Sequence, residues 1–147
     1  MDTFNEILDF AISREEEAYQ FYTDLAGKMT RPYMRDVFED FAREERGHKM
    51  KLTAIKQGKL EEPKLKRVVD LKIGDYLIDI EPGKNIDYQQ ALVLAMKREK
   101  AAFRLYTDLA AKVHDEDLRG TFLMLAQEEA KHKLRFEIEY DEILSEN

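Results

Sequence analysis

Two short segments decide the fold of this chain: FAREERGH at residues 41–48 and LAQEEAKH at residues 125–132. Each contains a glutamate and, three residues later, a histidine. Residues three apart lie on the same face of a helix. A single pair of this kind is more often an incidental surface pair than a functional site. The two copies, however, stand 84 residues apart in a register without gaps, which indicates a duplicated helical unit.

The same register relates longer stretches of the two halves. The segment YTDLA at residues 22–26 recurs at residues 106–110, and Glu15 falls on Glu99. The repeat therefore supplies four carboxylates and two imidazoles in a two-fold arrangement. We predict two helical hairpins related by a pseudo-two-fold axis. The helices of each hairpin are expected to run antiparallel, because the connection between them is short.

Apolar residues recur at alternating steps of four and three along four segments, which is the spacing of helices packed in a bundle. Capping or turn residues mark the expected starts of these helices: Thr3, Thr30, Asp87 and Asp115. A proline is tolerated in the first turn of the second helix, and Gly58 favours its end. The predicted fold is an all-α four-helix bundle.

The length of the chain suits one domain over residues 1–147. We expect a first hairpin at about 3–58, a crossover at about 59–86 and a second hairpin at about 87–144. A helix of about 26 residues is ~39 Å long, so ~12 extended residues are enough to span it. The crossover can therefore join opposite ends of the bundle. Its apolar residues suggest packing against the bundle or a second subunit, and a homodimer is expected.

Composition excludes several classes of function. The net charge of −7 argues against nucleic acid or an anionic membrane as a partner. The chain has no Cys, which excludes disulfides, thiolate metal sites, iron–sulfur clusters and Cys nucleophiles. Residues 1–10 lack the pattern of a signal peptide, and no apolar run reaches the ~18 residues of a membrane span. A cytoplasmic location is expected.

Four acids occupy positions that the apolar pattern assigns to the bundle interior. They are Glu15, Glu45, Glu99 and Glu129, each with apolar neighbours on both sides of its own stripe. Other acids, among them Glu44 and Glu128, fall off the stripes and are expected on a solvated face. Buried carboxylates without partners are costly, and four close together are worse. The pattern therefore predicts compensating cations inside the bundle.

Two divalent ions would balance the four carboxylates. Mixed carboxylate and imidazole ligation suits iron or manganese, with zinc as a further option. The six candidate metal ligands are Glu15, Glu45, His48, Glu99, Glu129 and His132. We expect Glu45 and Glu129 to bridge both ions. Glu15 with His48 would then serve one ion and Glu99 with His132 the other, although the pairing of outer carboxylates with imidazoles depends on helix placement.

Two tyrosines stand two helical turns beyond the outer acids. Tyr22 follows Glu15 by seven residues, and Tyr106 follows Glu99 by the same interval. One interpretation is core packing. The other is a hydrogen bond from each phenol to a ligand carboxylate. The sequence leaves both open.

At these residues the chain resembles the rubrerythrin family of ferritin-like di-iron carboxylate proteins. The resemblance covers essentially the whole chain: acids on the first and third helices, Glu-x-x-His on the second and fourth, and a long crossover between helices two and three. It implies a ferritin-like bundle with an oxo- or hydroxo-bridged di-iron centre that reacts with hydrogen peroxide or dioxygen. In rubrerythrins proper, the usual activity is NAD(P)H-linked peroxide reduction through an electron-donor protein.

The chain departs from rubrerythrins proper in two ways. They carry a rubredoxin-like domain with Cys-ligated iron, whereas this chain has no Cys, so electrons are expected from a separate protein. Their third helix also offers an extra carboxylate one turn after its first ligand. The corresponding residue here is Ala102, matched by Ala18 in the first half, which predicts a more symmetric site.

Three functions follow as hypotheses. The leading one is a redox enzyme that reduces hydrogen peroxide or dioxygen at two iron ions, with electrons from an external donor protein. The second is iron handling, including ferroxidation, storage or delivery. The third is a non-catalytic four-helix module in which the metals are structural.

Overall fold

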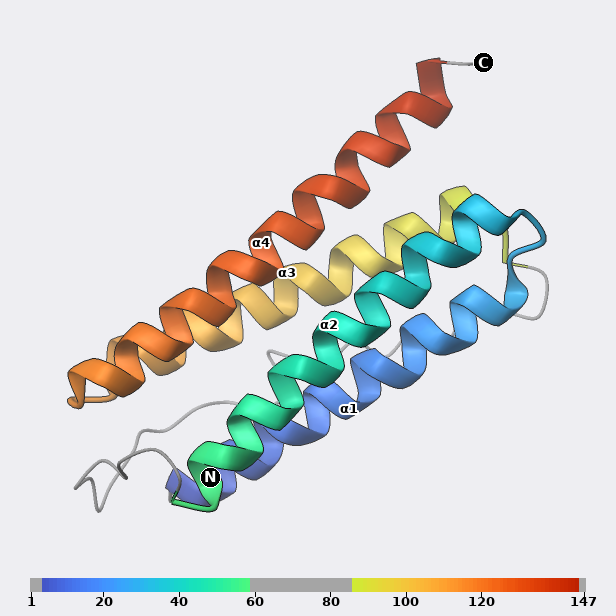
Figure 1. The fold of residues 1–147 in the computed structure, drawn as a ribbon. Helices are drawn as coiled ribbons and strands as arrows, with labels where there is room; N and C mark the ends of the chain where they lie inside the picture. Colours follow the sequence, from blue (N-terminus) through green and yellow to red (C-terminus); the bar gives the residue numbers. More distant parts are fainter. Residues whose placement is uncertain (1–3, 59–85, 146–147) are drawn as a thin grey trace.

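The computed structural model describes residues 4–58 and 86–145, which form a bundle of four helices (Figure 1). The helices are α1 (Phe4–Lys28), α2 (Pro32–Lys56), α3 (Tyr88–Lys112) and α4 (Glu116–Ser145). These two ranges contain no strand. Helices α1 and α2 form one antiparallel hairpin, and α3 and α4 form the other. The predicted all-α four-helix bundle is confirmed, and the expected start at Thr3 lies outside the described residues.

Side-chain caps explain where the second hairpin's helices begin. The Asp87 carboxylate accepts a hydrogen bond from the Gln90 backbone N–H (2.7 Å), and the Gln90 side chain accepts one from the Asp87 N–H (3.1 Å). This capping box satisfies two N–H groups that α3 leaves without intrahelical partners. The Asp115 carboxylate likewise accepts from the Leu118 N–H (2.9 Å) at the start of α4. Both predicted starts are therefore correct.

The ends of α2 also follow from its sequence. The helix begins with Pro32, whose missing N–H would have no partner at that position. Gly58 follows its last turn with a φ of +75°, a backbone conformation that glycine adopts without steric cost. Helix α2 ends at the end of the bundle where α1 begins, whereas α3 begins at the opposite end (Figure 1). The predicted crossover between them lies outside the described residues.

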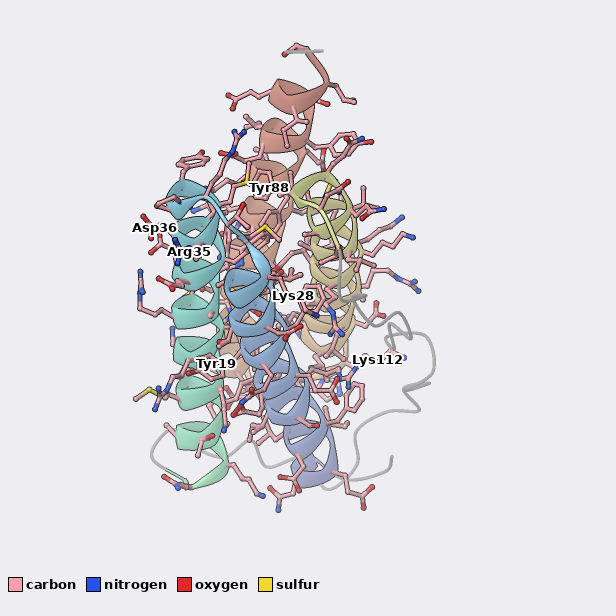
Figure 2. The ribbon with its side chains drawn as sticks, turned by 90° about the vertical axis from the view of Figure 1, so that its right-hand side faces the viewer. Tyr19, Lys28, Arg35, Asp36, Tyr88 and Lys112 are labelled. Atoms are coloured by element: carbon pink, nitrogen blue, oxygen red, sulfur yellow. The ribbon has the colours of Figure 1, made fainter. Side chains whose placement is uncertain are left out.

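The core consists of two apolar clusters, one toward each end of the bundle. The first includes Leu8, Leu52, Leu109 and Phe122, one from each helix. The second includes Tyr22, Phe38, Leu92 and Phe136, again one from each helix. Charged side chains such as Arg35, Asp36 and Lys112 point outward (Figure 2). Among the helices that the structure describes, none combines the length and apolar character needed to cross a membrane.

Candidate metal centre

Each helix contributes to a polar layer between the two apolar clusters. The layer contains Glu15 from α1, Glu45 and His48 from α2, Glu99 from α3, and Glu129 and His132 from α4. As whole residues, the four glutamates are 1–2% exposed and the two histidines 6%. Within residues 4–58 and 86–145, these six are the buried acidic and basic side chains. The positions that the sequence assigned to the interior are therefore interior positions.

The six side chains form two overlapping groups. One contains Glu15, Glu45, His48 and Glu129, and the other contains Glu45, Glu99, Glu129 and His132. Within each group, one potential ligand atom per residue lies within 4.8 Å of all the others. The two groups share their central carboxylates, those of Glu45 and Glu129. The structure thus places the carboxylate of Glu15 with the imidazole of His48, which is one of the two pairings that the sequence left open.

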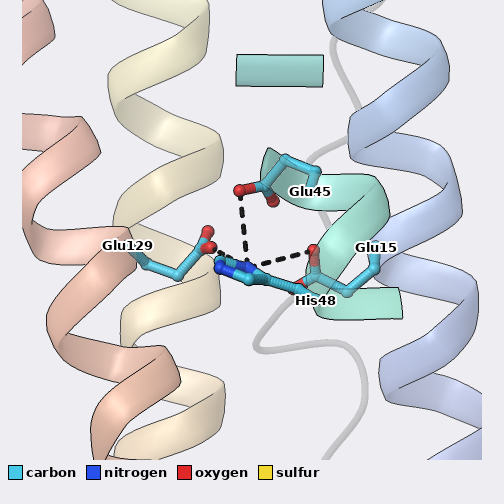
Figure 3. A group of neighbouring side chains, drawn as sticks. All are labelled: Glu15, Glu45, His48 and Glu129. Atoms are coloured by element: carbon cyan, nitrogen blue, oxygen red, sulfur yellow. Dashed lines mark ion pairs between the residues drawn. The ribbon is translucent and has the colours of Figure 1, made fainter. Parts of the chain in front are cut away.

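Both imidazoles present the same nitrogen, Nδ1, to the interior, as Figure 3 shows for His48. The Nδ1 atom of His48 lies 2.8 Å from Glu129 Oε1, 3.5 Å from Glu15 Oε2 and 3.6 Å from Glu45 Oε1. The Nδ1 atom of His132 lies 3.2 Å from Glu45 Oε1. The two rings are nearly parallel, at 7° with centroids 6.1 Å apart. Two imidazole nitrogens therefore face the shared carboxylates from the same side.

Several buried atoms of this layer make no hydrogen bond within the described structure. They are Glu15 Oε2, Glu45 Oε1, Glu99 Oε2, both Glu129 carboxylate oxygens, and the Nδ1 atoms of both histidines. Carboxylate oxygens that face one another repel, and burial increases the cost. A cation between them would satisfy the orphaned atoms. The donor set, with four carboxylates and two imidazoles around a closed volume, fits two divalent metal ions.

The layer shifts the pKa values of its own groups. Burial, followed by the charge of neighbouring carboxylates, raises the pKa of Glu45 and Glu129 well above the usual value. Burial acts to lower the pKa of His48, but the surrounding carboxylates outweigh it and raise that pKa to about 9. The same balance raises the pKa of His132 to about 12. Without metal, the layer therefore holds protons that metal ions must displace.

The two tyrosines pack in the core and also hydrogen-bond to the outer acids. The Tyr22 hydroxyl on α1 donates to Glu99 Oε1 on α3, and the Tyr106 hydroxyl on α3 donates to Glu15 Oε1 on α1. Both side chains are fully buried. Burial raises the pKa of both phenols, so they stay protonated and act as donors. Both interpretations that the sequence left open therefore hold, and each bond joins the two hairpins.

Sequence reasoning missed the role of two further acids. Glu128 on α4 hydrogen-bonds to the Nε2 atom of His48, and Glu44 on α2 forms an ion pair with the Nε2 atom of His132. Both side chains are about half exposed, as expected for residues off the apolar stripes, but each also contacts a histidine of the opposite hairpin, which the apolar pattern did not predict. The signal in the sequence was their recurrence in the 84-residue register, one position before each Glu-x-x-His.

A surface pocket of about 500 Å³ lies over these contacts, between α2 and α4. Its lining consists of Glu44, Gly47, His48, Lys51, Glu128, Lys131 and His132. The edges of both imidazoles thus form part of its floor. The polar layer is closed on its apolar sides and approaches solvent on this one.

The sequence model described as Rubrerythrin matches residues 6–140. Three solved structures resemble the chain along most of its length. A hypothetical protein from Pyrococcus furiosus is 26% identical, with a TM-score of 0.73, and the match covers 96% of this chain and 90% of that one. An uncharacterized conserved protein from Magnetospirillum magnetotacticum is 27% identical, with a TM-score of 0.71 and 95% of each chain covered.

The third structure is a putative ferritin-like diiron-carboxylate protein from Thermotoga maritima. It is 20% identical, with a TM-score of 0.77 and 94% of each chain covered, so this likeness shows the fold alone. A search of curated proteins gives no match. Because the family match spans nearly the whole chain and includes the complete polar layer, the chain belongs to the rubrerythrin family.

Proposed function

We propose that this protein is a di-iron oxidoreductase that reduces hydrogen peroxide or dioxygen. The observation that carries the proposal is the pair of overlapping ligand groups, which share Glu45 and Glu129. Two metal ions side by side suit a reaction that needs two electrons at once. Membership of the rubrerythrin family supports iron as the metal.

In this proposal, six side chains hold the two ions. Glu45 and Glu129 would bind both ions, because both belong to each group. Glu15 and His48 complete one site, while Glu99 and His132 complete the other. Two ferrous ions, when bound, would supply two electrons, which is enough to reduce hydrogen peroxide to water or dioxygen to hydrogen peroxide.

The protein's own residues control the surroundings of that chemistry. Tyr22 and Tyr106 orient the outer carboxylates by donating hydrogen bonds, and they hold those hydroxyl protons at neutral pH because their pKa values are raised. The apolar clusters above and below exclude water from the layer. Ala102, where rubrerythrins proper have another carboxylate, is partly buried and packs against the core. The proposed reaction therefore uses six protein ligands.

The electrons for repeated turnover come, in this proposal, from a separate donor protein. The chain has no Cys and cannot itself hold Cys-ligated iron. A homodimer also stays a prediction, which size-exclusion chromatography with light scattering tests.

The proposed function is tested by rapid mixing of the anaerobic di-ferrous protein with hydrogen peroxide or dioxygen. We expect oxidation much faster than that of free Fe(II) at the same concentration and pH. The Glu45→Gln variant, which loses a bridging charge, should be slow, whereas Glu39→Gln, an exposed position on the same helix, should match the wild type. Oxidation no faster than free Fe(II) would refute the proposal. Uptake of many irons per chain would favour iron handling instead.

A further inference from the structure

We propose that Glu44 and Glu128 are positioning residues that orient the two imidazoles for metal binding. Each acts from the opposite hairpin: Glu128 of α4 holds His48 of α2, and Glu44 of α2 holds His132 of α4. The inference rests on the proposed metal centre. It extends that centre beyond its six candidate ligands to two half-exposed residues.

The choice of partner argues against an incidental contact. Glu44 stands four residues before His48 on the same helix, a spacing at which side chains commonly meet. It pairs instead with His132 on the other hairpin. Glu128, four residues before His132, shows the same preference for the opposite helix. The internal repeat thus supplies two instances of one arrangement.

The contact also selects the state of the ring that a metal requires. A carboxylate next to Nε2 favours a proton on that nitrogen, which leaves the lone pair of a neutral imidazole on Nδ1. In both rings Nδ1 is the atom that faces the buried carboxylates, at 2.8 Å from Glu129 for His48 and 3.2 Å from Glu45 for His132. The outer carboxylate therefore fixes both the tautomer and the ring orientation.

The position of these acids adds a second reason. The side chains of Glu44 and Glu128 are 55% and 42% exposed and line the pocket between α2 and α4, whereas the histidine side chains behind them are 8% exposed. The carboxylates thus stand between each ring and solvent. Without them, water in the pocket would compete for Nε2, and the ring would lose its restraint. Each pair also joins the two hairpins at the level of the metal layer.

The test is a Co²⁺ titration of the metal-free protein, followed by the visible absorption of the bound ion. Wild type should bind two Co²⁺ per chain. Glu128→Ala should weaken one of the two binding events by about 10–100-fold, and Glu44→Ala the other. Glu128→Gln and Glu44→Gln should restore most of the affinity and the wild-type band shape, because an amide oxygen still accepts from Nε2–H. Glu39→Ala, an exposed position on α2, is the matched control.

A double-mutant cycle assigns each effect to its ring. Glu128→Ala should cost little further affinity in a His48→Ala background and its full effect in a His132→Ala background. If the wild type binds fewer than two Co²⁺, the proposed metal centre fails, and this inference fails with it. If the wild type binds two, but both alanine variants bind with unchanged affinity, only the positioning role is refuted. A lower melting temperature of the metal-free variants with unchanged affinity refutes it equally.

Discussion

At the scale of single residues, the two buried tyrosines are the clearest coupling between the hairpins. Tyr106→Phe removes the donor to Glu15, and Tyr22→Phe removes the donor to Glu99. Each leaves a buried carboxylate oxygen without its partner, so we expect the metal-free protein to lose about 1–3 kcal/mol of unfolding free energy. Urea denaturation measures the loss. Tyr19→Phe, half-buried on α1, is the control, and an equal loss in all three variants would contradict the prediction.

The outer carboxylates make a second residue-scale prediction. Residues 15–17 are three consecutive glutamates, and the repeat register selects Glu15 as the ligand. Glu15→Ala should lower the metal content from two ions per chain to about one, measured by elemental analysis after anaerobic loading with Fe(II). Glu99→Ala should do the same for the other ion.

The neighbouring Glu16 provides the matched control for that experiment. Its carboxylate lies at the surface and pairs with Lys49 at 2.8 Å, away from the buried layer. Glu16→Ala should therefore keep both metals. Two ions retained in both Glu15→Ala and Glu99→Ala would contradict the ligand assignment.

At the scale of helices, the capping box at the start of α3 makes a third prediction. Asp87→Ala removes the carboxylate that accepts from the Gln90 N–H, so the free energy of unfolding should fall by about 0.5–2 kcal/mol. Metal stoichiometry should not change, because the cap lies three turns from Glu99. Urea denaturation and elemental analysis measure the two quantities. Lys100→Ala, exposed within the same helix, should change stability by less, and an equal effect would argue against the cap.

The helices were predictable because local sequence determines their ends and their buried faces. Asp87 and Asp115 supply caps through contacts within three residues, and the apolar spacing alone assigned Glu15 to the interior. Contacts between hairpins were harder to predict, because they depend on how far each helix is rotated toward its neighbour. For that reason the sequence left the pairing of Glu15 with His48 open. It also left the partners of the tyrosine hydroxyls undecided.

The same limit explains the half-exposed acids. Glu44 and Glu128 lie off the apolar stripes, and a periodicity that reports only burial assigns such residues to solvent. Their contacts with His132 and His48 cross from one hairpin to the other. Repetition in the 84-residue register marked them as a pair. It carried no information on which helix each would face.

At the scale of the whole molecule, the bundle encloses a charged layer between two apolar clusters. The clusters supply the burial that drives folding, whereas the layer opposes it as long as no cation is present. Because of the duplication, each hairpin places two carboxylates and one imidazole in this layer. Stability and metal binding are therefore linked in this fold, and pH acts on both through the same groups.

The linkage predicts that metal ions stabilise the protein more as pH rises. Glu45 and Glu129 have a pKa of 4.5 in the unfolded chain and a raised pKa in the folded protein. At a pH between these two values, the folded protein holds more protons than the unfolded chain. The stability of the metal-free protein therefore falls as pH rises. The stabilising charges of His48 and His132 are fully present below pH 6.5 and are lost as pH rises through about 9 and about 12. Metal ions displace these protons when they bind, so the affinity of the protein for metal rises as pH rises.

The gap between the melting temperatures of the Zn²⁺-loaded and metal-free proteins should therefore widen steadily from pH 5 to pH 9. Zn²⁺ suits this measurement because it has no redox chemistry of its own. A Glu45→Gln/Glu129→Gln variant lacks the two carboxyl groups whose protons the metal ions displace in the wild type. The stability of its metal-free form should vary less with pH, and Zn²⁺ should add less to it. A wild-type gap that stays constant or narrows across this range would show that the buried carboxylates do not hold protons in the metal-free protein.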